Sequence, residues 1–530
     1  MKLFPKIILI IILVASLSSC HKDPGKASWD VSVMAPLINT TLTLNNLLTD
    51  SLIQVNPDTS LKIVYNNTLY SVSVDSLVNI PNTISQQAFS SNFTLDSVLP
   101  DSPILINDTD KNHLSLGDAQ VTEIIVKSGF VNITINNSLN DKILCTYQIP
   151  YATLDGVPFS VTDYVPAGTV SAPSSYTVKV DISGYKLNLT GVHGNSCNTL
   201  ISVINSWTDP HGGKVSIFPG DSLKAKASFN GLIIDYAKGY FGSQSFQSGK
   251  KDSPFSLFSK ITAGTLKLQS MQLTLSISNG FGIDASLLIN ELKSINSRTG
   301  NVVPLISPII GNTINITRAQ ESGNASAPVI PTSYSFNMNS SNFLQLINNL
   351  PDSLEYSISM TTDPLGNVSA GNDFVYNNYG FNANLDLVIP LSLVANNLTL
   401  TDTIGFNLSK PNGYILNHGV LTLIANNGFP FSAAMQLFLL DANNRKTDSL
   451  IVSNNIISSP PLNTSYKVVS PLTSIIKVPL SAAKLSDLYN AKKMIVVARF
   501  NTAGQPNYIK LYDYYNLGIQ LTGDFNMTVN

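Results

Sequence analysis

Short runs in which apolar and polar residues alternate recur along this chain of 530 residues. Clear examples are residues 131–135, 273–277 and 421–423, each followed by Asn or Gly within a few residues. Such alternation is typical of strands with one face in the core and one in solvent. Helical spacing appears only over 342–349 and 483–491, and the chain has 29 Asp but 4 Glu, the acid that helices favour. We therefore predict an all-β fold.

The strands carry an internal repeat. Residues 135–139 (INNSL) align with 277–281 (ISNGF) and 425–429 (ANNGF), which places the copies 142 and 148 residues apart. Each copy separates an alternating run from a second apolar run, and Asn-Gly favours the type I′ turn of a β-hairpin. A second pair supports this period, because TDPHG at 208–212 recurs as TDPLG at 362–366.

These repeats predict tandem antiparallel β-sandwich-like modules with a period of about 145 residues. The predicted modules are 30–231, with an insertion near 50–115, then 232–384 and 385–530. Frequent turns favour sandwiches over a parallel sheet, which needs a helix at each crossover. The alternative is an elongated, curved-sheet fold whose apolar face binds a lipid.

The first twenty residues have the features of an export leader. Lys2 and Lys6 precede an apolar run over 7–15, which is shorter than the roughly 20 residues that span a bilayer. The run leads into Leu17-Ser18-Ser19-Cys20, which resembles the lipobox of bacterial lipoproteins. The resemblance implies a signal peptide over 1–19, diacylglycerol and an acyl chain such as palmitate on Cys20, and a tether over 20–29.

Several acyl chains make membrane anchoring effectively permanent. His21 follows the cysteine, where an aspartate would resemble an inner-membrane retention signal. We therefore expect anchoring in the outer membrane, on its periplasmic face or at the cell surface. The charged residues 21–23 are similar to export tags of Bacteroidetes lipoproteins, and the chain resembles uncharacterised envelope lipoproteins of that group.

The charge balance excludes nucleic acid as a partner. Without the leader, 29 Lys and Arg stand against 33 acids, a net charge of −4. Charged residues make up 12% of the chain, so its polar surface consists largely of Asn, Ser and Thr.

Two cysteines remain besides Cys20. Cys145 and Cys197 are an even pair in an oxidising compartment, which makes them a candidate disulfide, with two buried free thiols as the alternative.

Asp followed by Ser or Thr and an aliphatic residue occurs more often than composition alone accounts for. The triplet resembles the O-glycosylation sequon of Bacteroidetes envelope proteins, and the alternative is that Asp-Ser merely opens turns before strands. The candidate hydroxyls are Ser51, Ser76, Ser97, Ser222, Ser353, Thr403 and Ser449.

No catalytic or metal-binding constellation stands out in the sequence. Gly220-Asp221-Ser222-Leu223 resembles the signature of GDSL esterases, but the Asp-x-x-His pair of that family is absent around His418. The five histidines are scattered, and we expect no cofactor and no metal. Tyr376, Tyr379 and the Tyr512, Tyr514, Tyr515 group are candidates for stacking on sugars, with core packing as the alternative.

The sequence therefore predicts a lipoprotein of the outer membrane or cell surface that is not an enzyme. We expect a binding or structural scaffold whose partners are the membrane, through its lipid anchor, and a glycan or an envelope protein. A lipid-binding carrier is the second hypothesis and a hydrolase the third.

Overall fold

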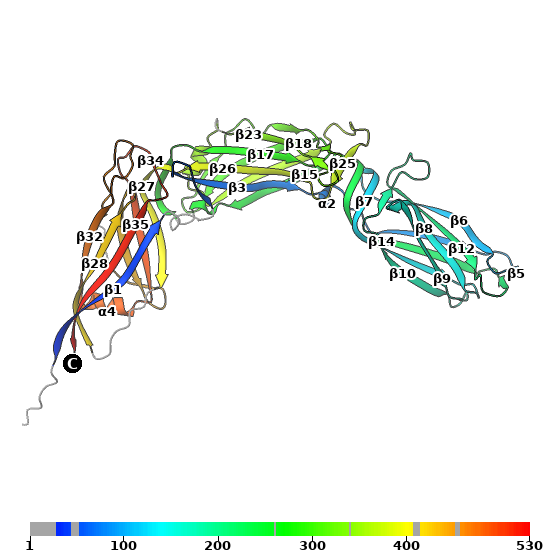
Figure 1. The fold of residues 1–530 in the computed structure, drawn as a ribbon, viewed down its shortest axis with the longest axis horizontal. Coiled ribbons are helices and arrows are strands. Elements are labelled where there is room, and N and C mark those ends of the chain that lie inside the picture. Colours follow the sequence, from blue (N-terminus) through cyan, green and yellow to red (C-terminus); the bar gives the residue numbers. More distant parts are fainter. Residues whose placement is uncertain are drawn as a thin grey trace, which may run out of the picture.

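The computed structural model describes residues 28–43, 52–258, 261–338, 341–405, 414–450 and 456–529. Antiparallel strands dominate, and both expected helices are present as α3 (Phe343–Asn348) and α4 (Ala482–Asn490). The strands form three sandwich-like modules in one row (Figure 1). The predicted all-β, sandwich-like fold is thus confirmed. We name the modules distal, central and terminal, and the terminal module contains both ends of the described chain.

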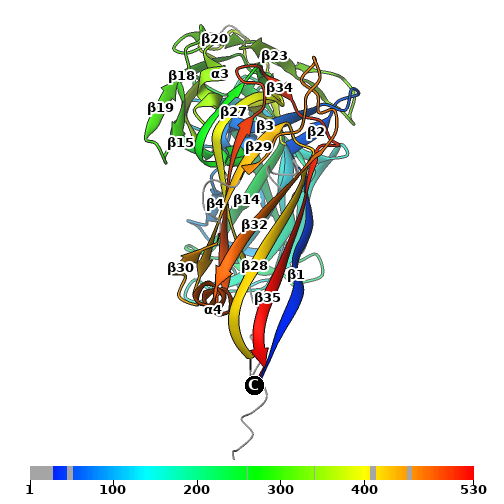
Figure 2. The ribbon, with the colours of Figure 1, turned by 90° about the vertical axis from the view of Figure 1, so that its left-hand side faces the viewer.

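The first sheet has the same strand order in all three modules, which is first strand, last strand, and then two strands from the middle of the module. In the distal module these strands are β4 (Thr83–Ser90), β14 (Ser222–Tyr240), β7 (Gln120–Asn137) and β10 (Ser174–Asp181). In the central module they are β3 (Leu61–Val72), β26 (Phe381–Pro390), β17 (Gln272–Asn279) and β23 (Thr332–Asn337). In the terminal module they are β1 (Trp29–Thr43), β35 (Asn516–Val529), β28 (Tyr414–Asn427) and β32 (Leu472–Ser481), which lie side by side in Figure 2.

The second sheet repeats in the same way. The distal module uses β6 (Pro103–His113), β12 (Thr199–Thr208), β8 (Ile143–Leu154) and β9 (Val157–Val165). In this module the short strand β11 (Lys186–Asn188) pairs with both β7 and β8, so the two groups of strands form one continuous sheet. The central module uses β15 (Ser245–Pro254), β24 (Ser353–Thr362), β18 (Ala285–Asn296) and β19 (Asn301–Pro304). The terminal module uses β27 (Ser392–Gly405), β33 (Lys493–Thr502), β29 (Phe431–Leu440) and β30 (Lys446–Ser449). The internal repeat therefore extends to the whole topology of each module.

The three modules are nested. The chain begins in the terminal module with β1, continues into the central module with β3, and enters the distal module at β4. It then completes the modules in reverse order, so that β14, β26 and β35 close the distal, central and terminal modules. The first long strand of each module pairs with its last strand, whatever the length of chain between them. In the central module the three-residue strand β2 (Ile53–Val55) precedes β3 and pairs with its other edge.

This strand pairing corrects the tandem order expected from the sequence. Asp30 pairs with Thr528 near the other end of the chain, and the expected boundaries at 231 and 384 fall inside β14 and β26. The segment 50–115, expected to be an insertion, supplies β3 and β4. Alternation along a segment identifies a strand and its buried face, but it carries no information about a partner hundreds of residues away.

The repeated Asn turn is not the expected hairpin. In each copy it connects two strands that do not pair with each other: β7 with β8, β17 with β18, and β28 with β29. Gly280 and Gly428 do not have a positive φ, which both central residues of a type I′ turn require. A Cβ at either glycine would lie 2.9 Å from a carbonyl oxygen, that of Gly380 or Asn516. Glycine is needed here because two backbones approach closely.

A buried asparagine holds each of these three arches together. Asn137, Asn279 and Asn427 lie at corresponding positions, each at the end of a strand. The amide nitrogen donates to the carbonyl four residues later and to another 29, 38 or 31 residues later, and the amide oxygen accepts the N–H two residues later, all at 2.7–3.0 Å. Three hydrogen bonds per side chain fix the path of the chain between the two sheets.

The second sequence repeat also has a structural role, and the structure adds a third copy. Thr208, Thr362 and Thr502 end β12, β24 and β33, and all three are buried. The hydroxyl oxygen of each threonine accepts a hydrogen bond from a backbone N–H of a neighbouring segment. The donors are Ser102 for Thr208, Gln244 for Thr362 and Ala395 for Thr502. The third copy escaped sequence comparison because Thr502 lacks the Asp-Pro that follows the other two.

Strands and apolar packing both cross the joints between modules. The 19-residue strand β14 stays paired with β7 of the distal module along its length, and at residues 236–239 it also pairs with β25 (Asp373–Tyr376), which lies between β24 and β26 of the central module in the chain. Strand β16 (Ile261–Leu268), which precedes β17 of the central module, pairs with β27 of the terminal module. A single cluster of buried apolar side chains extends through all three modules. The row is therefore connected by packing as well as by the chain.

Candidate functional site

The candidate glycosylation sites do not form one site. Ser76, Ser97 and Thr403 are exposed on the central, distal and terminal modules. Three others are only half-buried, namely Ser222, Ser353 and Ser449. Ser51, like Cys20, lies outside the described residues. The Oγ of Ser222 lies 3.1 Å from that of Ser138 at the arch between β7 and β8, which is a structural contact within the repeat.

The two remaining cysteines are free thiols, which corrects the candidate disulfide. Cys145 lies opposite Ser206 near the end of β12, whereas Cys197 comes just before the start of that strand. Ser206 lies seven residues from the first residue of β12, about 23 Å at the usual rise of a strand, and Cys197 lies beyond that first residue. The two sulfur atoms are therefore too far apart to form a disulfide. Burial raises the pKa of the Cys145 thiol to about 12.

Of the five candidate sugar-stacking rings, two are buried and two, Tyr376 and Tyr379, are half-buried. Tyr512 and Tyr515 are buried, and Tyr514 alone of that group is exposed. Tyr376 packs against Tyr236 with ring centroids 4.6 Å apart, next to the joint between the distal and central modules. Core packing accounts for these rings better than presentation to a ligand, with the exception of Tyr514.

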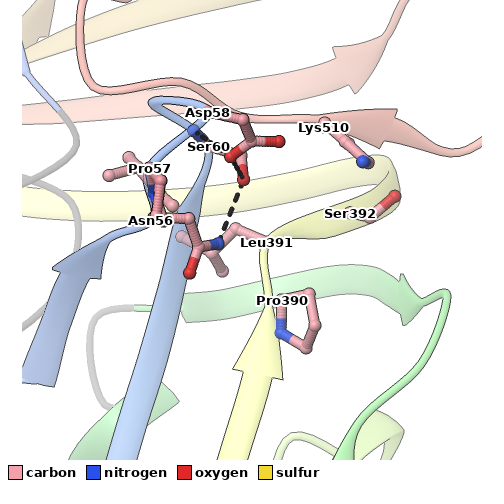
Figure 3. Close-up of a pocket in the computed structure, with 9 residues that line it drawn as sticks. Asn56, Pro57, Asp58, Ser60, Pro390, Leu391, Ser392 and Lys510 are labelled. Atoms are coloured by element: carbon pink, nitrogen blue, oxygen red, sulfur yellow. Dashed lines mark hydrogen bonds between the residues drawn. The ribbon is translucent and has the colours of Figure 1, made fainter.

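A polar groove lies at the joint between the central and terminal modules (Figure 3). Three leucines from distant segments link the main chain here, because the N–H of Leu61 donates to Leu511, that of Leu511 to Leu391, and that of Leu391 to Leu61, at 2.8–2.9 Å. The groove has a volume of about 410 Å³. It is lined by Asn56, Pro57, Asp58, Ser60, Leu61, Pro390, Leu391, Ser392 and Lys510.

An acid and a base face the groove from different segments (Figure 3). Asp58 lies in the turn before β3 and accepts hydrogen bonds from the Ser60 hydroxyl at 2.5 Å and the Ser60 N–H at 3.0 Å. These bonds hold the pKa of Asp58 below its usual value. Lys510, on the short strand β34 (Ile509–Lys510), makes no side-chain hydrogen bond or ion pair with the described residues. The groove thus offers a carboxylate, an ammonium and an amide to a small polar ligand.

Sequence analysis did not identify this groove. Its walls come from three segments, around residues 56–61, 390–392 and 510, which only the nested topology brings together. The available signal was the segment NPDTS at 56–60, which has strong turn chemistry between two apolar runs.

A partly buried acidic cluster lies at the other joint, near β25, in which Asp363 and Asp373 are buried and the Asp284 side chain is partly exposed. Arg318 donates from Nη1 to Asp373 at 2.9 Å and from Nη2 to Asp284 at 2.8 Å, while Asp363 is buried nearby. Burial, with a further contribution from Asp373, raises the pKa of Asp363 to about 7. One guanidinium faces three carboxyl groups, so the pair Asp363 and Asp373 retains a proton near neutral pH. Asp363 belongs to the repeated TDPLG segment, which was the sequence signal for this position.

The far end of the distal module carries exposed apolar side chains. The short strands β5 (Leu95–Val98) and β13 (Val215–Ile217) pair at this end (Figure 1). Large apolar residues in and around these strands are exposed, namely Phe93, Leu95, Leu99 and Phe218. We call these four residues the tip patch. Clustered exposed apolar groups are typical of interaction surfaces.

Two further observations concern membranes and metals. No helix in the described part of the chain is long and apolar enough to cross a bilayer. Within the same residues, no group of three or more His, Cys, Asp or Glu side chains is arranged to hold a metal ion.

Comparisons with known proteins leave the function open. No protein-family model and no curated protein matches the chain. A solved structure named "putative secreted protein" from Parabacteroides distasonis is 8% identical over 94% of this chain and 99% of its own, with a TM-score of 0.26. Infectious bursal disease virus, Gx strain, gives 11% identity over 87% and 81%, with a TM-score of 0.15. A peptide-N(4)-(N-acetyl-β-D-glucosaminyl) asparagine amidase gives 10% identity over 57% and 96%, with a TM-score of 0.14. Scores this low transfer neither a fold nor a function.

Proposed function

We propose that this chain is a non-catalytic scaffold of the bacterial cell envelope, lipid-anchored at Cys20 in the outer membrane, which holds its distal module away from the bilayer. The observation that carries the proposal is the placement of the chain ends. Trp29 pairs with Val529 in the terminal module, while the distal module lies at the opposite end of the row (Figure 1). An anchor that precedes β1 therefore holds the row by one end.

The tip patch is the surface that we propose for interaction with a partner. Phe93, Leu95, Leu99 and Phe218 lie at the end of the row that is farthest from the anchor. A rod that is anchored at one end presents its opposite end, here the tip patch, to molecules elsewhere in the envelope. We propose an envelope protein as the partner of the tip patch, because such apolar side chains favour burial against another apolar surface.

Site-specific photo-crosslinking in cells tests the proposal. A photoreactive residue at Phe218, in the tip patch, is compared with one at Val302 on β19 of the central module. Both side chains are 52% exposed, so they are matched in accessibility. We expect one discrete protein adduct from position 218 and none from position 302. Equal labelling, or no adduct at 218 in membranes that contain the protein, contradicts the proposal.

The anchor is tested separately. Wild type and Cys20→Ala are compared by intact mass and by membrane fractionation. The proposal expects diacylglycerol and acyl mass, and outer-membrane location, for wild type alone. Identical masses and a soluble wild type would remove the anchor from the account.

A glycan is the second candidate ligand, favoured by the polar groove at the joint between the central and terminal modules. Sugars are bound by carboxylate, amide and ammonium groups beside an exposed aromatic ring. The groove supplies Asp58, Asn56 and Lys510, and Tyr514 lies on the segment that follows Lys510. A glycan array with wild type and Asp58→Ala tests this, and binding that is equal in both variants argues against the groove.

A lipid carrier has less support. The apolar cavity between β16, β27 and β29 has a volume of about 70 Å³, against roughly 300–1,000 Å³ for typical ligand pockets. Organic extraction followed by mass spectrometry decides the matter, because a carrier would release one stoichiometric lipid besides the Cys20 anchor.

A further inference from the structure

The end of the terminal module where the chain begins is a narrow ribbon of three strands. Trp29 of β1 pairs with Val529 of β35, and Val529 also pairs with Tyr414 of β28. Figures 1 and 2 show these three strands meeting at the tapered end of the module, beside the mark for the C-terminus. We call this end the terminal pole.

Both faces of the terminal pole carry exposed apolar side chains. Trp29 is 65% exposed and Val31 38%, and their spacing places them on one face of β1. Met34 and Ile415 are 75% and 52% exposed and lie on the opposite face, since they pair with Asp524 and Thr528. A folded partner that packed on one face would leave the other face in water. A medium that surrounds the ribbon would cover both.

The first charged side chain of β1 is engaged with the protein. Asp30 accepts a hydrogen bond of 2.6 Å from the Thr528 hydroxyl, which occupies part of its hydrogen-bonding capacity. Trp29 precedes it at the extreme end of the strand. Tryptophan favours the boundary between headgroups and acyl chains, where its ring is in an apolar layer and its N–H can reach water.

The length of chain between anchor and strand limits where this end can be. Trp29 comes nine positions after Cys20, and a fully extended chain of that length spans at most about 32 Å. Acyl chains on Cys20 would therefore hold Trp29 close to the bilayer surface. This limit favours lipid, among all the media that could surround the ribbon.

We propose that the terminal pole, with Trp29 at its end, inserts into the interfacial layer of the lipid bilayer and so fixes the orientation of the row on the membrane. The inference rests on the proposed lipid anchor for its setting. It adds a second contact, made by side chains, which would limit rotation about the tether.

The two tryptophans of the chain allow a direct test. Trp207 lies on β12 of the distal module, far from the terminal pole (Figure 1). Lipidated full-length Trp207→Phe, which retains Trp29, and Trp29→Phe, which retains Trp207, are reconstituted into phosphatidylcholine and phosphatidylglycerol vesicles. Each variant is measured in two vesicle preparations, one with bromine on the acyl chains near the headgroup and one without bromine. Circular dichroism confirms that both variants are folded.

We expect bromine to reduce the emission of Trp29 at least twofold and to leave the emission of Trp207 unchanged. The emission of Trp29 should also shift to shorter wavelength on transfer from detergent-free buffer to vesicles. Equal quenching of the two tryptophans, or none of Trp29 in protein that floats with the vesicles, overturns the inference and leaves the anchor intact. A blue shift that depends on protein concentration without vesicles would show that a second copy covers Trp29, and that result also overturns it.

Failure of the anchor gives a different result. If intact mass shows no lipid on Cys20, the proposed function loses its anchor, and the Trp29 measurement is repeated with Cys20 coupled to a maleimide lipid in a Cys197→Ser background. Quenching of Trp29 alone would then still support membrane contact of the terminal pole, and its absence would refute that contact.

Discussion

Trp29 lies directly opposite Val529 in the ladder between β1 and β35, so the first and last described strands of this chain are neighbours. The same relationship holds within the other modules, where β3 pairs with β26 and β4 with β14. In the terminal and central modules, the chain that follows the first long strand goes on to form the next module of the row. The distal module is thus the only one of the three whose strands all come from one continuous segment, residues 83–240.

The arch asparagines should matter for stability far more than their neighbours. Asn427→Ala removes three hydrogen bonds in a buried arch, and we expect a loss of about 2–4 kcal/mol in the free energy of unfolding. Asn426→Ala, at the exposed position next to it, is the control, with an expected change below about 0.5 kcal/mol. Urea denaturation of the full chain measures both. Similar midpoints for the two variants would show that the arch is not held by this side chain.

Stability should fall as the pH rises toward and through neutrality. The pKa of Asp363 is raised to about 7 in the folded chain, so the folded state binds a proton that the unfolded state releases at a much lower pH. The contribution of Asp363 to stability is then greatest below the pKa that this residue has in the unfolded chain. It decreases as the pH rises from there to about 7. Asp363→Asn should flatten this decline. The exposed Asp252→Asn serves as control and should keep it, and thermal unfolding between pH 4 and 8 measures the effect.

Thiol titration should find one reactive and one protected cysteine. In a Cys20→Ala background, Cys197 is partly exposed, whereas Cys145 is buried and its pKa is raised to about 12. We expect one thiol per chain to react with a thiol reagent in native buffer at pH 8 and two in denaturant. Two unreactive sulfurs that appear only after reduction would indicate the disulfide that the strand register excludes.

The sequence predicts the elements of this fold better than their arrangement. Alternation located β7, β17 and β28, and helical spacing located α3 and α4 to within one or two residues, because these signals are local. The repeat also identified the asparagines at the arches. It suggested hairpins because Asn-Gly is common in them, but here glycine is required by close backbone contacts with Gly380 and Asn516.

Partners distant in sequence could not be predicted. The Thr528 hydroxyl bonds to Asp30, 498 residues away, and nothing in either segment specifies the other. The groove and the acidic cluster were missed for the same reason, since their residues meet only when the nested modules are assembled. Arg318 and Asp373, for instance, are 55 residues apart and look like ordinary surface charges in the sequence.

Cysteine crosslinking between β1 and β35 is the measurement that tests the nested fold most directly. Ser32 lies opposite Asn526, so the pair Ser32→Cys and Asn526→Cys should form a disulfide or accept a short crosslinker, in a Cys20→Ala, Cys197→Ser background. The control pair, Ser32→Cys with Lys226→Cys on β14, tests the tandem order, in which both residues would share one module. Nesting predicts a crosslink between 32 and 526 and none between 32 and 226, read by peptide mass spectrometry. The opposite pattern would contradict the nested fold and the placement of both chain ends in one module.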